Sequence, residues 1–177
     1  MDGASKNYAP VEYPGIADLE TTMELKQAAA ELGISCHMGI SVSTDSFWPG
    51  QERYDSFGGY VLRRLQGSMD EFRHLGCTNY EMENATLFTV TSVLGLKASS
   101  ICGVVAQRTS GEAVASRDVY LQAEEKFRKI VRKMLENRSN AGENRLKGDR
   151  LAPIISASII KRDYPFFRKV SFYYAFR

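Results

Sequence analysis

The feature that most constrains the fold is a long amphipathic segment at residues 117–137. Apolar residues recur there every three or four positions, and Lys, Arg and Glu occupy most positions between them. That spacing places the apolar side chains on one face of an α-helix and the charged side chains on the other. The predicted buried face consists of Tyr120, Ala123, Phe127, Ile130, Val131, Met134 and Leu135. This is the clearest helix in the chain, and the fold must cover its apolar face.

Upstream of this helix, segments typical of strands alternate with segments typical of helices. Asp18 is suited to cap a helix that Gly33 ends, because its carboxylate accepts from free N–H groups and glycine readily leaves the helical conformation. Ser68 is the expected cap of a second helix. Further helices are predicted at residues 68–75 and 85–94, and strands at residues 34–42, 77–82 and 98–106. The alternation indicates an α/β domain with a mixed, mostly parallel sheet.

The composition is that of an ordinary globular protein, with 44% hydrophobic and 25% charged residues among 177. A formal charge of +2 gives no reason to expect nucleic acid or a membrane surface as a partner. The three cysteines, Cys36, Cys77 and Cys102, are an odd number in apolar contexts. We therefore expect reduced thiols in a cytoplasmic protein. Because they also lack the paired spacing of zinc ligands, no metal site is predicted.

Residues 46–55 read Ser-Phe-Trp-Pro-Gly-Gln-Glu-Arg-Tyr-Asp, and the Pro-Gly pair predicts a loop. Phe47 offers a planar ring, Gln51 an amide with a donor and an acceptor, and Arg53 a guanidinium. These groups suit a flat heterocycle with alternating carbonyl and N–H groups, and Arg53 can stabilise a base that departs as an anion. The alternative interpretation is an ordinary surface loop in which Gln-Glu-Arg is solvated.

A second motif, Asn-Tyr-Glu-Met-Glu, occupies residues 79–83. The loop at 46–55 resembles the base-recognition loop of the uridine phosphorylases, in the nucleoside phosphorylase superfamily, and the second motif resembles that family's ribose-binding motif. The resemblance begins at the Asp-Gly-Ala-Ser of residues 2–5 and ends near Asn137. It implies the C-terminal part of a three-layer α/β/α domain, over residues 1–137. One departure is Asn84, where the family pattern leads us to expect serine.

The resemblance implies reversible phosphorolysis of uridine to uracil and ribose 1-phosphate, in nucleoside catabolism and pyrimidine salvage. Phosphate would be a co-substrate, with no cofactor and no metal. The family's base-binding positions correspond to Phe47, Gln51, Arg53, Val105 and Ala106, and its ribose-binding positions to Glu81, Met82 and Glu83. Arg53 and Glu83 are the expected catalytic residues. The resemblance also implies a homo-oligomer built from dimers, with a hexamer as one candidate.

Two alternatives stay open. Purine-specific relatives tend to carry an aspartate, as a general acid, where this sequence has Gln107, so Gln107 favours a pyrimidine over a purine nucleoside. The family's phosphate-binding strings, a Gly-Asp-Pro turn and Gly-Thr-Thr-Gly, do not occur in the 177 residues. The chain is therefore expected not to turn over uridine alone. A catalytically inactive fragment or interaction remnant of such an enzyme is the second alternative.

Residues 138–177 carry no resemblance to the family. Residues 139–149 have the polar composition of a linker, and β-prone apolar runs follow at residues 154–160 and 171–176. One interpretation is a C-terminal extension that forms a hairpin. The other is the product of a frameshift or a mistaken gene model.

Overall fold

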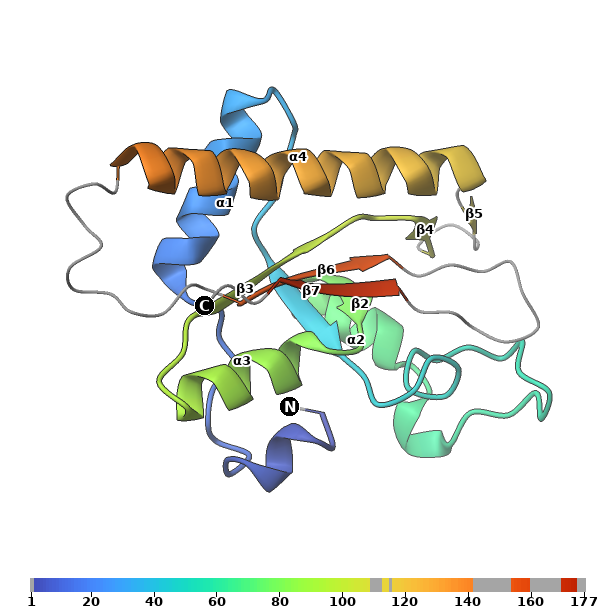
Figure 1. The fold of residues 1–177 in the computed structure, drawn as a ribbon. Helices are drawn as coiled ribbons and strands as arrows, with labels where there is room; N and C mark the ends of the chain where they lie inside the picture. Colours follow the sequence, from blue (N-terminus) through green and yellow to red (C-terminus); the bar gives the residue numbers. More distant parts are fainter. Residues whose placement is uncertain (1, 109–112, 115, 142–153, 160–169, 175–177) are drawn as a thin grey trace. The chain divides into compact units, whose positions relative to one another are not determined.

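The computed structural model describes residues 2–108, 113–114, 116–141, 154–159 and 170–174 (Figure 1). The chain forms two compact units, each assembled from two separate stretches. The first unit contains Met1–Ile16 and His37–Leu94, and the second contains Ala17–Cys36 and Gly95–Arg177. Helices and parallel strand pairs occur in the chain, which confirms the predicted α/β class.

The first unit is built on two short parallel strands. Its elements are η1 (Ser5–Asn7), β1 (Ile40–Ser43), η2 (Arg63–Leu65), α2 (Ser68–His74), β2 (Cys77–Glu81) and α3 (Asn84–Val93). Strand β1 pairs with β2 in parallel, with Val42 opposite Tyr80 and Ser43 opposite Glu81. Helix α2 packs on β2. The rings of Phe72 and Tyr80 meet edge to face there, with their centres 6.1 Å apart.

The strand predicted at residues 34–42 is much shorter in the structure. Only Ile40–Ser43 are a strand, because their partner β2 has five residues and Cys77, its first, lies opposite Ile40. The apolar residues before Ile40 follow the sequence pattern of a strand but find no ladder partner among the described residues. The prediction for residues 77–82 is confirmed, with β2 one residue shorter at its end.

The second unit packs two helices together beside a three-stranded sheet (Figure 1). Its elements are α1 (Leu19–Glu31), β3 (Ala98–Cys102), β4 (Ala106–Gln107), β5 (Ala113–Val114), α4 (Arg117–Ala141), β6 (Ile154–Ile159) and β7 (Val170–Tyr174). The predicted cap of α1 is confirmed, since Thr21 N donates to the Asp18 carboxylate at 2.8 Å. Strand β6 pairs in parallel with β3 and antiparallel with β7.

The amphipathic helix forms as its pattern predicts, but it continues to Ala141, into residues that were predicted to be a linker. Two clusters lie along the apolar face of α4: Ile130, Val131 and Met134 pack with Leu25, Ala28 and Ala29 of α1, and Tyr120 and Phe127 pack with Val105. The strand predicted at residues 98–106 is interrupted after Cys102. A side chain at Gly103 would meet the Phe127 ring at 2.5 Å, so the chain passes close under α4 at that point. It resumes as β4, which pairs with β5.

The paired strands fall into three sheets, not one: β1–β2, β3–β6–β7 and β4–β5. The β-prone runs predicted at residues 154–160 and 171–176 overlap with strands β6 and β7, which pair antiparallel. Whether this part of the chain is a true extension stays open. The three-layer arrangement and the boundary at residue 137 stay predictions. No helix within the described ranges is long and apolar enough to cross a membrane.

Candidate functional site

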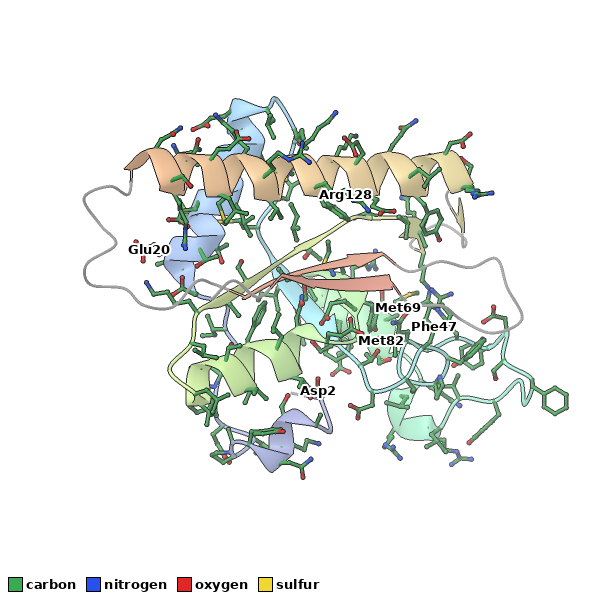
Figure 2. All side chains as sticks on the ribbon, viewed as in Figure 1. Asp2, Glu20, Phe47, Met69, Met82 and Arg128 are labelled. Atoms are coloured by element: carbon green, nitrogen blue, oxygen red, sulfur yellow. The ribbon has the colours of Figure 1, made fainter. Side chains whose placement is uncertain are left out.

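The two predicted motifs emerge from the same edge of the β1–β2 pair. Because the strands are parallel, their carboxyl ends lie side by side, and that is where α/β proteins commonly bind ligands. The loop at residues 46–55 follows β1, and Met82 and Glu83 follow β2. A hydrogen bond from Thr44 N to Glu81 O, at 3.0 Å, continues the ladder to this edge. Figure 2 labels Phe47 and Met82 on the two segments.

The loop at 46–55 is compact. Gly50 N donates to Ser46 Oγ at 3.0 Å, and Arg53 N donates to Trp48 O at 2.8 Å. Gly50 has no room for a side chain, since a Cβ there would lie 2.6 Å from Ser46 O. The predicted loop is therefore confirmed as a tight, internally bonded turn.

Two of the three predicted base-binding side chains of this loop, Gln51 and Arg53, are buried, and Phe47 is half-buried. Gln51 is 1% exposed and Arg53 is 5% exposed. The Arg53 guanidinium carbon lies 4.2 Å from the centre of the Phe47 ring, and Phe47 meets Trp48 edge to face at 5.4 Å. The structure thus brings Phe47 and Arg53 into contact. The alternative of a solvated Gln-Glu-Arg surface loop is wrong for both Gln51 and Arg53.

Glu52, between these two residues, does not share their environment. Its carboxylate accepts from Gly67 N at 2.5 Å and from Met69 N at 2.8 Å, at the start of α2. Ser68, the predicted cap of α2, makes no capping bond. Gly67 occupies the cap position at φ +81°, and Glu52 supplies the acceptor from 15 residues away. Burial alone would raise the pKa of Glu52, but these backbone hydrogen bonds outweigh it and the pKa is lowered.

The Glu81 carboxylate is used by the protein's own backbone. One oxygen accepts from Glu83 N at 2.7 Å and from Asn84 N at 2.6 Å, and the other accepts from Ser43 Oγ. The side chain is 3% exposed. Glu81 therefore fixes the turn that carries Met82 and Glu83. The predicted contact of Glu81 with the ribose stays a prediction.

Two other side chains accept hydrogen bonds from the next two backbone N–H groups at the start of α3. Ser43 Oγ accepts from Ala85 N at 2.8 Å, and the Asp2 carboxylate accepts from Thr86 N at 3.1 Å and Thr86 Oγ1 at 2.7 Å. Two carboxylates at a helix N-terminus are favourable against the helix dipole. An incoming phosphate would have to displace them, so this helix end is closed to anions.

Glu83 and Met82 lie at the edge where ligand could approach. Glu83 is the N-cap residue of α3, and both side chains are half-buried. Val105 and Ala106 belong to the second unit. The Val105 side chain packs with Tyr120 and Phe127, and Ala106 opens β4. The placement of these two residues in a base pocket stays a prediction. Within the described residues no cluster of His, Cys, Asp or Glu is arranged to hold a metal ion.

Comparison with known proteins identifies the family of this chain. Residues 1–136 match the phosphorylase superfamily. The chain belongs to the phosphorylase superfamily. The matched residues include the whole first unit, α1, β3 and most of α4, whereas β6 and β7 lie beyond them.

Three curated relatives of this superfamily member show how far the similarity extends. Uridine phosphorylase of Escherichia coli K12 is 44% identical over 131 residues, which is 74% of this chain and 51% of the relative. Uridine phosphorylase of Thermococcus kodakarensis is 40% identical over 145 residues, 81% of this chain and 52% of the relative. Guanosine phosphorylase of Halorubrum lacusprofundi is 31% identical over 110 residues, 62% of this chain and 40% of the relative. The chain spans about half the length of the uridine phosphorylases that it matches.

Proposed function

We propose that this chain carries the base and ribose sites of a uridine phosphorylase, a pentosyltransferase that reversibly converts uridine and phosphate to uracil and ribose 1-phosphate. The observation that carries the proposal is the buried Arg53 guanidinium, held 4.2 Å from the Phe47 ring in a loop beside the Glu83 turn. The similarity to uridine phosphorylases supports the same assignment.

The chemistry follows from the charges that develop as the N-glycosidic bond breaks. Positive charge builds on the sugar and negative charge on the base, so a catalyst must stabilise both. A guanidinium with little exposure to water interacts strongly with a developing anion, and Arg53 is the expected donor to the uracil carbonyl oxygen. Gln51 supplies an amide that fixes the base orientation, and Phe47 supplies a ring for stacking.

On the sugar side, Glu83 is the expected acceptor for the ribose hydroxyls. Two charge-assisted bonds from neighbouring hydroxyls would fix the sugar's orientation relative to the base. Met82 supplies an unbranched, adaptable side chain for packing against the ribose. The Glu81 carboxylate holds this turn in place through Glu83 N and Asn84 N.

Phosphate binding is assigned to residues outside these motifs. The Gly-Asp-Pro and Gly-Thr-Thr-Gly strings of the family do not occur in the chain, and the N-terminus of α3 is closed by Glu81, Ser43 and Asp2. We therefore assign the phosphate contacts to a separate polypeptide segment that associates with these residues and completes the site. A cytoplasmic homo-oligomer acting in pyrimidine salvage completes the proposal.

A test separates binding from turnover. Purified protein is titrated with uridine and with uracil by calorimetry, and uracil release is followed separately after addition of phosphate. The proposal expects saturable binding of both ligands. Absence of binding at high protein concentration would reject it. Binding without uracil release would identify this chain as a non-catalytic module of such an enzyme, which is the second candidate.

A purine nucleoside is the third candidate, and the similarity to a guanosine phosphorylase is the observation in its favour. A competition experiment between uridine and inosine decides between the two bases. The pyrimidine assignment expects uridine to bind more tightly and Arg53→Ala to weaken uridine binding. Tighter binding of inosine, unaffected by Arg53→Ala, would favour the purine assignment.

A further inference from the structure

Glu52 has the one positive φ among the described non-glycine residues, at +51°. This left-handed backbone conformation is unfavourable for an L-residue with a side chain, so the surrounding contacts must hold it. It allows Glu52 to turn toward α2 while its two neighbours, Gln51 and Arg53, are buried. The loop backbone on either side is fixed by Glu52 N to Pro49 O at 3.2 Å and Arg53 N to Trp48 O at 2.8 Å.

The carboxylate of Glu52 links two segments that are 15 residues apart in the sequence. It joins the loop after β1 to Gly67 N and Met69 N at the start of α2, and Ser68 Oγ lies 3.5 Å from it. Helix α2 in turn packs on β2 through Phe72 and Tyr80. A continuous set of contacts therefore runs from the loop carrying Arg53 to the strand that ends in the Glu83 turn.

We infer that Glu52 is a positioning residue, which locks residues 46–55 onto α2 and so keeps Arg53 over Phe47 in the geometry that recognises the base. This inference rests on the proposed function and extends it to a residue with no direct contact to the base. Both carboxylate oxygens of Glu52 accept hydrogen bonds from N–H groups at the start of α2. Glu52 therefore affects base recognition through the position of its neighbour Arg53. The charge of Glu52 makes these bonds stronger than those of a neutral acceptor.

Two variants separate the carboxylate from the backbone conformation. Glu52→Gln keeps the length of the side chain but removes its charge. Glu52→Gly removes the carboxylate while accepting φ +51° without strain. The matched control is Glu71→Gln, which removes a charge from an exposed position on the same helix, α2. All are made in the full 177-residue chain, and circular dichroism melts establish that each variant is folded.

The readout is built into the loop. Trp48 is the protein's one tryptophan and lies 5.4 Å from the Phe47 ring centre, so its emission reports on the loop without added label. We expect both Glu52 variants to shift Trp48 emission in the absence of ligand and to weaken uridine binding about tenfold or more. The loss should be larger for Glu52→Gly, which removes the acceptor of both Gly67 N and Met69 N. Glu71→Gln should change neither quantity.

A double variant tests whether Glu52 acts through Arg53. If it does, Glu52→Gln combined with Arg53→Ala weakens uridine binding no more than Arg53→Ala alone, whereas independent effects would multiply. Unchanged Trp48 emission in both Glu52 variants, or fully multiplicative losses, would overturn the inference.

The outcomes for the two proposals are distinguishable. If the unmodified protein binds neither uridine nor uracil, the proposed function fails, and Trp48 emission alone then judges Glu52: a shift supports positioning of the loop, and no shift rejects it. Should Glu52→Gly fail to fold, Glu52→Gln carries the comparison by itself.

Discussion

At the scale of single residues, Arg53 is the most unusual feature of the molecule. A guanidinium is rarely buried, and here it is 5% exposed and lies over an aromatic ring in a tight loop. The burial of Arg53 beside an aromatic ring is the reason why we propose this loop for ligand recognition.

Replacing Arg53 should weaken uridine binding more than replacing an exposed arginine on α2 does. Arg53→Lys keeps the charge but loses the planar fork of donors, and we expect uridine binding to weaken by ~2 kcal/mol. Calorimetric titration of the folded variant measures this loss. Arg73→Lys, at an exposed position on α2, is the matched control and should bind uridine as the unmodified protein does. Equal uridine affinity of the unmodified protein, Arg53→Lys and Arg73→Lys would show that Arg53 does not contact the base.

Asp2 provides a prediction of pH dependence at the same scale. Burial alone would raise the pKa of Asp2, but hydrogen bonds from Ser5 and Thr86 outweigh it and lower the pKa below its usual range. A carboxyl whose pKa is depressed in the folded state stabilises the fold above its unfolded pKa and loses that effect as the pH falls through its folded pKa. Asp2→Asn should therefore be less stable than the unmodified protein near neutral pH, and the difference should shrink in acid. Urea unfolding at several pH values measures it, and a difference independent of pH would contradict it.

At the scale of elements, the N-terminus of α3 is held by side chains from three separate segments. Glu81, Ser43 and Asp2 each accept from one of its first N–H groups. Capping of this kind stabilises a helix and also fixes its first turn, where Glu83 lies. Helix α4 depends instead on apolar packing, since its core-facing side chains meet α1.

Removal of the Glu81 carboxylate tests the first of these arrangements. We expect Glu81→Ala to lower the free energy of unfolding by ~1–2 kcal/mol, because two backbone N–H groups lose their acceptor. Uridine binding should weaken as well, since the Glu83 turn is no longer fixed. Glu12→Ala, at an exposed position of the same unit, should have no effect on either quantity. A Glu81→Ala protein as stable as the Glu12→Ala control would rule out this role.

Packing of α4 is tested in the same helix. Met134 is 1% exposed in the cluster with α1, and Met134→Ala should cost ~2–5 kcal/mol through lost burial and a cavity. Lys129→Ala removes a solvent-facing side chain whose nearest carboxylate is 3.7 Å away and should cost no more than ~1 kcal/mol. Denaturant unfolding followed by circular dichroism compares the two. Equal losses would mean that the apolar face does not stabilise the fold.

At the scale of the whole molecule, each compact unit joins stretches that are far apart in the chain. The second unit brings α1 together with β3, α4 and the late strands β6 and β7. Strand β6 occupies one edge of β3 along all five of its residues. Strands β6 and β7 are therefore part of the sheet of that unit, although they lie outside the residues that match the superfamily.

Deletion of residues 142–177 tests this arrangement. The truncated chain loses β6 and β7, and the edge of β3 becomes free to pair with other chains. We expect a lower melting temperature and concentration-dependent association, measured by circular dichroism and sedimentation velocity. A truncated protein that stays monodisperse and melts unchanged would show that β6 is not required by the second unit.

Features that depend on local periodicity or local chemistry could be predicted from the sequence. The apolar repeat of α4, the Asp18 cap of α1 and the Pro-Gly turn of the loop at 46–55 each involve residues within a few positions of one another. The motifs at 46–55 and 79–83 also led to the superfamily and to Arg53 and Gln51 as candidate site residues.

Features that depend on distant partners became apparent in the folded structure. That structure assigned Glu52 to the start of α2 and Asp2 to the start of α3, roles for which the sequence carries no local signal. It also shortened β1 to four residues and split the expected sheet into three. The physical reason is that a carboxylate or a strand edge bonds to whichever N–H group the fold brings within reach, and that proximity is set by packing, not by sequence spacing.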